Sequence, residues 1–224
     1  MRGFFQKSPA SVPRVVSPFS ETMSRIYWKG SALLAPVPSV IVTCGNGERA
    51  NMITIGWCGV ASTRPPRVYI SVRPERYSHG IIKETGEFVI NLTPSSLARE
   101  CDYIGTMTGR KIDKAAKTGL TLIPSETVAS PTIEQSPLAL ECRVYKTILL
   151  GSHDMFIADV TKVSVDERFV APDGRLRLDR ADLLVFAHGE YFQIGKKIAP
   201  IGFSVSKAKK RSSKKTAAES DKNR

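Results

Sequence analysis

The amino-acid sequence predicts a mainly β protein, an antiparallel barrel with a few short flanking helices. Six or more short runs are rich in β-branched and aromatic residues, as strands are. Most of these runs are joined by hairpin-like turns, and they do not alternate with helices in the order that βαβ units require. With 42% hydrophobic residues among 224, the chain can bury one core, and nothing in it demands two domains.

The first predicted hairpin joins residues 39–44 to residues 50–57. The earlier run is β-branched and ends in a Gly-Asn-Gly sequence, whose residue types tolerate the positive φ of a tight turn. Residues 63–66 include two prolines, which cannot donate to a strand ladder. They therefore form the turn into the next strand, residues 67–73, in which apolar and polar side chains alternate.

Short helices follow. Ser78 is placed to cap a helix that runs to Glu84, and Gly86 is placed to end it in the left-handed conformation. After a strand at residues 88–92, Thr93 supplies the N-cap of a second helix and the proline behind it the first turn.

The spacing of apolar residues and a terminal glycine predict the second and third helices. Leu97, Cys101 and Ile104 lie on one face of the second helix. Residues 110–117, closed by Gly119, predict a third helix that is short, basic and mostly exposed.

The remaining chain is predicted to be β structure. Past the connection at residues 124–137, strands are expected at residues 138–150, 155–165, 183–186 and 191–194. Residues 151–154, Gly-Ser-His-Asp, join the first two of these strands as a hairpin loop.

Residues 51–62 differ from an ordinary strand, because small and hydroxyl-bearing residues are mixed with β-branched ones. Gly56, Gly59, Ala61 and Ser62 would let the backbone approach a flat, polar ligand closely. Trp57, in the middle of the stretch, is either a core residue or a ligand contact.

A phosphate site is predicted next to this stretch. Thr54, Arg73, Arg76, Tyr77 and Ser78 offer hydroxyls and cations beside a helix start, which are the groups that bind phosphate. The alternative explanation is a pair of surface arginines next to a routine helix cap.

Charge and cysteine content restrict the class of protein. The net charge is +12, but residues 207–224 hold eight basic and two acidic side chains, so half of the excess lies in a C-terminal tail. This tail has no apolar periodicity, which indicates a disordered, solvated segment rather than a nucleic-acid or membrane contact. The four cysteines are far apart and form no C-x-x-C pair, which favours buried, reduced thiols and a reducing compartment, the cytoplasm.

The chain ends and its apolar runs give further expectations. No run approaches the roughly 18 to 20 apolar residues of a membrane span. Residues 1–22 contain three prolines and no continuous signal-peptide core, so they are expected to be disordered or an over-extended reading frame that precedes a natural start at Met23. One folded domain is expected over residues 23–204, followed by the disordered basic tail, residues 205–224.

Several of these motifs, in this order, resemble the flavin reductase-like, FMN-binding split-barrel family, including its flavoredoxin-type members. The resemblance covers about residues 28–200. It rests on the runs at residues 36–43, 51–57, 73–78, 88–92 and 151–154, together with Ser62, Pro65 and Pro66.

The resemblance implies a Greek-key split barrel that binds FMN, forms homodimers and holds the flavin near the subunit interface. Residues 73–78 would hold the phosphate and ribityl chain, and the 51–62 stretch would lie along the isoalloxazine. The implied cofactor-binding residues are Asn51, Met52, Ile53, Thr54, Trp57, Cys58, Gly59, Val60, Ala61, Ser62, Arg73, Arg76, Tyr77, Ser78 and Asn91. His153 is either a surface loop residue or, as the resemblance implies, a residue near the flavin that helps to bind nicotinamide or substrate.

The expected function is that of a flavin-dependent oxidoreductase that passes electrons from NAD(P)H, through bound FMN, to a flavin or another acceptor. No G-x-G-x-x-G fingerprint of a dinucleotide-binding fold is present, so NAD(P)H would meet the flavin on the barrel itself. Two alternatives stay open. One is a flavoredoxin-type FMN electron carrier without direct NAD(P)H turnover. The other is a nucleic-acid-binding module that uses the basic tail, although the sequence lacks the stacked aromatic residues of RNA-binding sheets.

Overall fold

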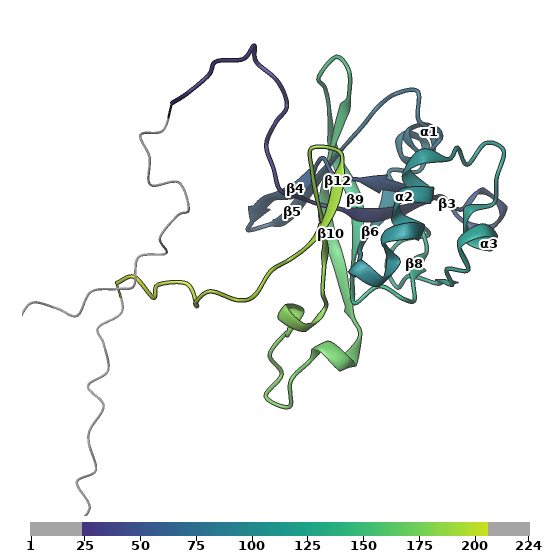
Figure 1. The fold of residues 1–224 in the computed structure, drawn as a ribbon. Helices are drawn as coiled ribbons and strands as arrows, with labels where there is room; N and C mark the ends of the chain where they lie inside the picture. Colours follow the sequence, from purple (N-terminus) through teal and green to yellow (C-terminus); the bar gives the residue numbers. More distant parts are fainter. Residues whose placement is uncertain (1–23, 206–224) are drawn as a thin grey trace, which may run out of the picture. The chain divides into compact units, whose positions relative to one another are not determined.

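The computed structural model describes residues 24–205 (Figure 1). The predictions for residues 1–22, for Met23 as a start and for nearly all of the basic tail therefore lie outside the described residues. The chain divides into two units at residue 34, and the described part of the first, residues 24–34, contains no helix or strand. The helices and strands of the described residues all lie in the second unit, which begins at Ala35. No helix in the described part of the chain is long and apolar enough to cross a membrane.

A seven-stranded antiparallel sheet forms the body of this unit, in the order β3-β2-β6-β9-β10-β5-β4. This arrangement confirms the predicted mainly β, antiparallel fold. The strands of the sheet are β2 (Val40–Cys44), β3 (Asn51–Ile55), β4 (Cys58–Thr63), β5 (Pro66–Val72), β6 (Glu87–Leu92), β9 (Leu138–Leu149) and β10 (Asp154–Val165).

The sheet curls until its two ends meet. β9 and β10 pair along their whole length, with register shifts at Ile157/Ala158 and Val160/Lys162 that increase the local twist. β3 and β4 stand at opposite ends of the strand order, yet only two residues separate the end of β3 from the start of β4. The chain thus passes from one end of the sheet to the other at Gly56 and Trp57. β3 confirms the strand predicted at residues 50–57, but the ligand-facing stretch at residues 51–62 is not one continuous strand, because the strand breaks where the barrel closes.

The first helix was predicted correctly in extent but not in its cap. α1 spans Tyr77–Thr85, and Gly86 ends it with φ of 69°. Ser78 is the second residue of the helix, and its hydroxyl accepts from Asn51 Nδ2 at 2.7 Å instead of capping backbone N–H groups. Ser78 is thus tied to β3.

The second and third helices start later than predicted. A short 3-10 turn (η2, Ser95–Leu97) precedes α2 (Ala98–Thr106), and the Thr93 hydroxyl caps neither. α2 packs closely against β3 (Figure 1), and a Cβ at Gly105 would lie 3.0 Å from Thr54 Cβ. Asp113 rather than an earlier residue caps α3 (Lys114–Thr118), and Lys114 is buried, whereas the segment was expected to be mostly exposed.

Two small sheets complete the unit. β1 (Val37–Pro38), β11 (Leu184–Ala187) and β12 (Glu190–Gln193) form one, and β7 (Leu122–Ile123) and β8 (Thr132–Ile133) form the other. The sequence did not predict β1, β7 or β8, since each has only two residues.

Apolar packing covers both faces of β2. Val40 and Val42 belong to one buried cluster, with Ile70, Phe88 and Phe156. Ile41 points the other way into a second cluster with buried residues of α2, among them Cys101 and Ile104. All four cysteines are unpaired, three of them buried and Cys58 partly so.

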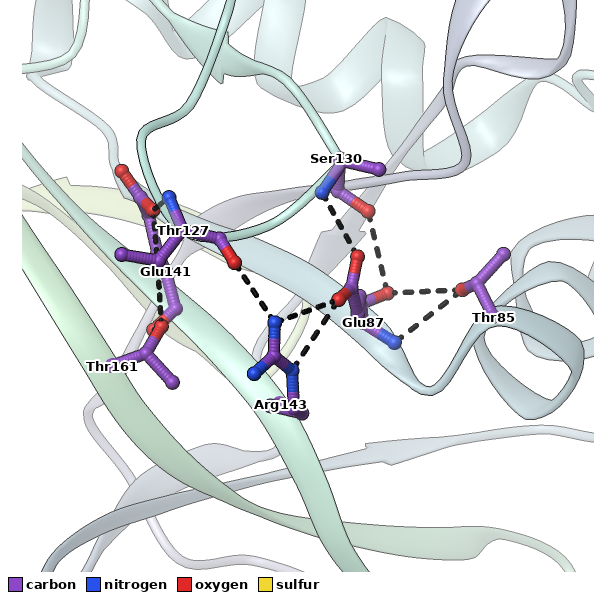
Figure 2. Close-up of polar contacts among 8 residues, drawn as sticks. Thr85, Glu87, Thr127, Ser130, Glu141, Arg143 and Thr161 are labelled. Carbon is purple, nitrogen blue, oxygen red and sulfur yellow. Dashed lines mark hydrogen bonds and ion pairs between the residues drawn. The ribbon is translucent and has the colours of Figure 1, made fainter.

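Two carboxylates fasten the segment at residues 126–130 onto the sheet (Figure 2). Buried Glu141 of β9 accepts from the backbone N–H groups of Glu126 and Thr127 at 2.9 and 2.6 Å. Glu87 of β6 accepts from Ala129 N–H at 2.8 Å and from Arg143 at 3.2 Å. Because these are charge-assisted bonds, they hold in place a connection that has no helix or strand of its own.

Candidate functional site

Two neighbouring cavities open beside β3, at the end of the barrel where the sheet closes, and they share Ile53 and Arg76. The first, of about 230 Å³, is called the ring cavity below; it is lined by Ile53, Thr54, Ile55, Gly56, Trp57, Ser71, Val72, Arg73, Arg76 and His153. The second, of about 170 Å³, is called the phosphate cavity; it is lined by Asn51, Ile53, Glu75, Arg76, Tyr77, Ser78, Met107, Thr108, Gly109 and Lys114.

The phosphate cavity contains a buried ammonium group. Lys114 Nζ donates to Met52 O and to Ile104 O, each at 2.7 Å, so two of its three N–H donors are used by backbone carbonyls. Within the described part of the chain no carboxylate pairs with it. Burial, and secondarily the positive charge of Arg76, lower the pKa of Lys114 to about 8. Because this pKa lies above 7, the Lys114 amine is mostly protonated at pH 7, and its positive charge has no ion-pair partner among the described residues.

Arg76 stands between the two cavities. Its Nη2 donates to Gly105 O at 2.6 Å, and among the described residues no carboxylate forms an ion pair with it. Arg73 differs from Arg76 in two ways. Of the two cavities it lines only the ring cavity, and its Nη1 lies 3.6 Å from Glu75 Oε1, so it has an acidic partner.

The phosphate cavity also contains one acid, Glu75, whose carboxylate lies 3.6 Å from the Arg73 guanidinium, and its remaining polar groups are neutral donors and acceptors. Asn51 and Ser78 are hydrogen-bonded to each other, which fixes both side chains, and Arg110 lies 5.6 Å over the Tyr77 ring. Lys114 and Arg76 have no ion-pair partner among residues 24–205, and they lie next to a hydroxyl, an amide and the start of α1, so together these groups form a site that favours an anion with several oxygens.

The ring cavity has one titratable side chain of catalytic type. His153 lies in the loop between β9 and β10, with Ser152 Oγ at 3.0 Å from its Nδ1. Burial, and secondarily Arg73, lower the pKa of His153 below its ordinary value of 6.5, against a smaller opposite effect of Glu75. The imidazole is therefore neutral at pH 7, and it can donate or accept a hydrogen bond in the cavity.

Small residues and hydroxyls make up the rest of the ring-cavity wall. A Cβ at Gly56 would meet Val37 Cγ2 at 3.4 Å and Pro38 O at 3.8 Å, both ordinary contacts, and the Thr54 hydroxyl donates to Cys101 O. Trp57 is 44% exposed, so it is not the core residue that was one of its two interpretations.

The structure brings nine of the predicted site residues together at the two cavities: Asn51, Ile53, Thr54, Trp57, Arg73, Arg76, Tyr77, Ser78 and His153. The others line neither cavity: Met52, Cys58, Gly59, Val60, Ala61, Ser62 and Asn91.

Those others divide by location. Met52 and Asn91 are about 1% exposed and belong to the core, where Asn91 bonds the backbone of Ile41 and Ile133. Cys58 to Ser62 lie on β4, beyond the point where the barrel closes. Gly59 is needed there because a Cβ would lie 2.9 Å from the Tyr69 ring.

Sequence reasoning missed Lys114, Ser71 and the segment at residues 107–109. Lys114 follows the capping residue Asp113 in a basic helix, and no local pattern distinguishes it from the exposed lysines around it. The Gly in Thr108-Gly109 was the one available signal, since a Cβ there would lie 2.0 Å from Asn51 Oδ1.

The chain resembles known proteins along most of its length. The profile of the flavin reductase-like domain family matches residues 33–195. An uncharacterized protein of Archaeoglobus fulgidus is 30% identical over 159 residues, which are 71% of this chain and 88% of that protein. The FMN reductase (NADH) RutF of Stutzerimonas stutzeri is 22% identical over 165 residues, 74% of this chain and 85% of that protein.

Among solved structures, flavoredoxin of Desulfovibrio vulgaris (Miyazaki F) superposes with a TM-score of 0.76 at 28% identity, over 82% of this chain and 100% of that chain. This likeness confirms the split-barrel fold that the sequence motifs implied.

Proposed function

The chain belongs to the flavin reductase-like domain family, and on that premise we propose that it binds FMN across the two cavities as a flavin-dependent oxidoreductase. The observation that carries the proposal is the pair of cations without acidic partners, Lys114 and Arg76, beside Ser78 and Asn51. A phosphate monoester supplies the negative charge that this arrangement lacks.

In this proposal the phosphate lies in the phosphate cavity and the isoalloxazine in the ring cavity. Arg76 would contact the ribityl-phosphate junction, since it lines both cavities. Gly56 and Thr54 would let the backbone of β3 approach the flavin edge, and Trp57 would cover the ring at the mouth of the cavity. Bound FMN supplies the chemistry of accepting a hydride and releasing one or two electrons.

His153 would place the electron donor or the acceptor against the ring. Its neutral imidazole can hydrogen-bond a carboxamide or a carbonyl without adding charge to the cavity. We infer NAD(P)H as the donor because RutF, to which the chain is similar, is an NADH-dependent FMN reductase.

An FMN electron carrier without NAD(P)H turnover is the second candidate, favoured by the likeness to flavoredoxin. Mixing the FMN-loaded protein with NADH or NADPH without oxygen separates the two functions. Rapid bleaching of the flavin absorbance identifies a reductase. An unchanged spectrum that bleaches with dithionite identifies a carrier.

Two arginines test the placement of the phosphate. Arg76→Ala should weaken FMN binding by roughly 10- to 100-fold, because a charge-assisted contact contributes roughly 1.5 to 3 kcal/mol. Riboflavin has the same ring but no phosphate, so it should bind the wild type and the variant equally. Arg73→Ala is the matched control, since Arg73 lines only the ring cavity and already faces Glu75. An equal loss of FMN and riboflavin affinity in Arg76→Ala, or an FMN-specific loss in Arg73→Ala instead, would contradict the placement.

A homodimer completes the proposal. Val60 of β4 pairs with the core residue Val68 across the strands and so lies on the inner face of the sheet, yet it is 74% exposed. Leu149, opposite buried Asp154, is 75% exposed on the same face. A second copy would cover these side chains near the ring cavity.

A further inference from the structure

A buried hydrogen bond between a histidine and a carboxylate links the segments that line the two cavities. His79 Nε2 of α1 lies 2.8 Å from Asp154 Oδ2 at the start of β10, and the two side chains are 8% and 11% exposed. The His79 ring also packs against Phe156, with ring centroids 5.3 Å apart. The pair therefore lies against the apolar core rather than in solvent.

Each member of the pair directly follows a cavity residue. Ser78, of the phosphate cavity, precedes His79, and His153, of the ring cavity, precedes Asp154. Backbone hydrogen bonds fix both junctions, from His79 N–H to Arg76 O at 3.0 Å and from Leu150 N–H to His153 O at 2.9 Å. The bond between the two side chains thus joins the start of α1 to the loop that carries His153.

Stability alone is a weak reason for a polar pair at this place. Replacing a buried ion pair with apolar residues of similar volume is often neutral or stabilising, and the neighbouring Ile81, Ile82 and Phe156 are apolar. A directional hydrogen bond, in contrast, fixes how two segments lie relative to each other, as apolar contacts do not.

We propose that His79 and Asp154 are positioning residues that hold the His153 loop at a fixed place relative to the start of α1. The distance between the two cavities is then fixed, so that one ligand can place its ring in the ring cavity and its phosphate in the phosphate cavity. The purpose of this fixed arrangement, to place a bound flavin, rests on the proposed function, but the positioning of the loop does not. Arg73 and Glu75 are the other charged groups near His153, and they act on it from the end of β5.

The titration of His153 reports the position of its loop without any flavin. The sequence contains three histidines, so their ring signals can be followed by NMR and assigned with His153→Ala and His188→Ala. In the wild type, burial and Arg73 lower the pKa of His153. In Asp154→Ala, which leaves His79 Nε2 without its acceptor, we expect this pKa to rise toward the ordinary value of about 6.5, because the loop moves into solvent. Loss of the neighbouring negative charge alone would lower it further, so the two explanations predict opposite signs.

A second variant removes any dependence on the folding of the first. The double variant His79→Phe/Asp154→Leu replaces the pair with apolar side chains and should keep the melting temperature near that of the wild type, yet it should also raise the pKa of His153. Glu84→Gln is the matched control, because Glu84 lies on the same helix as His79 and its 2.7 Å ion pair with Arg49, a residue before β3, is exposed. This variant should leave the pKa of His153 unchanged. A His153 pKa that stays the same or falls in the folded double variant would overturn the proposal. That result would leave the FMN proposal intact, since no flavin is present.

Discussion

At the scale of single residues, Lys114 is where burial, charge and the proposed ligand meet. Its folded pKa of about 8 lies below the ordinary value of 10.5, so between these pH values the unfolded chain holds more protons. Stability should therefore rise with pH across that window, and the cost of burying the charge is fully present below pH 8. A phosphate dianion beside the ammonium favours its protonated form and offsets this cost.

The corresponding prediction concerns Lys114→Met. FMN affinity at pH 7 should fall by roughly 10- to 100-fold, since a charge-assisted contact is lost, while riboflavin affinity should not change. The FMN affinity of the wild type should also decline above about pH 8, where Lys114 loses its proton, and the variant should show no such decline. Quenching of flavin fluorescence, titrated from pH 7 to about 9.5, measures both effects, because the phosphate itself stays dianionic well above its pKa of about 6. Parallel pH profiles for the two proteins would show that Lys114 does not meet the phosphate.

Residue types in the sequence pointed to Arg76 and Ser78 as site residues, and the family resemblance pointed to His153, but neither pointed to Lys114. The first three stand at the ends of elements, where turn and cap chemistry marks a position. The burial of Lys114 depends on α2 and β3, which supply the carbonyls of Ile104 and Met52 from 10 and 62 positions away. The residues next to Lys114 in the sequence therefore do not predict its burial.

At the scale of elements, the segment at residues 126–130 depends on Glu141 (Figure 2). Burial alone would raise the pKa of Glu141, but the N–H groups of Glu126 and Thr127 and the Thr127 hydroxyl lower it below 4.5 overall. The carboxylate's contribution is therefore fully present above the unfolded pKa of about 4.5 and is lost as the pH falls through the lower folded pKa.

We therefore predict that Glu141→Gln lowers the free energy of unfolding by about 1 to 3 kcal/mol at pH 7. The difference from the wild type should shrink as the pH falls through the folded pKa. Glu126→Gln is the control, because the Glu126 side chain is 66% exposed and its ion pair, with Lys162, lies on the surface; such surface pairs contribute about 0 to 1 kcal/mol. Urea unfolding at neutral and at acidic pH gives the comparison. Equal losses in both variants at pH 7, or a loss that does not depend on pH, would rule out this role of the buried carboxylate.

The strands were the elements that periodicity predicted best, and β2, β5, β6, β9 and β10 lie within one or two residues of their expected bounds. The break at Gly56 and Trp57 was not predictable in the same way. Residues 51–62 are compatible with one strand locally, and only the closure of the sheet, which places β3 and β4 at opposite ends of the strand order, divides them.

At the scale of the whole molecule, the charge of the chain is separable from the proposed site. Residues 207–224 carry half of the net charge of +12 but lack the apolar content to pack. Deleting them should leave the melting temperature and FMN affinity unchanged in thermal melts and flavin titrations. A lowered melting temperature would show that the tail packs on the rest of the protein.

Strand order belongs to this scale too, and the sequence did not predict it. Hairpins such as β9 and β10 follow from neighbouring runs, but the pairing of β5 with β10 joins residues more than 80 positions apart. The resemblance to the split-barrel family supplied this part of the fold, because the residues alone indicated only an antiparallel barrel.

The last prediction concerns the uncovered inner face of the sheet. If a second copy covers it, Val60→Glu places a charge in an apolar contact and should convert the protein to monomers, since an isologous interface receives the substitution twice. Size-exclusion chromatography with light scattering measures the mass directly. Val170→Glu is the matched control: Val170 is also apolar and 41% exposed, but it lies outside the seven-stranded sheet and should not alter the mass. FMN affinity of the monomeric variant then decides whether the second copy contributes to the ring cavity, because a cavity complete within one chain would bind FMN unchanged. A wild-type protein that is monomeric at every concentration would contradict the homodimer, and it would leave Val60 and Leu149 exposed for another reason.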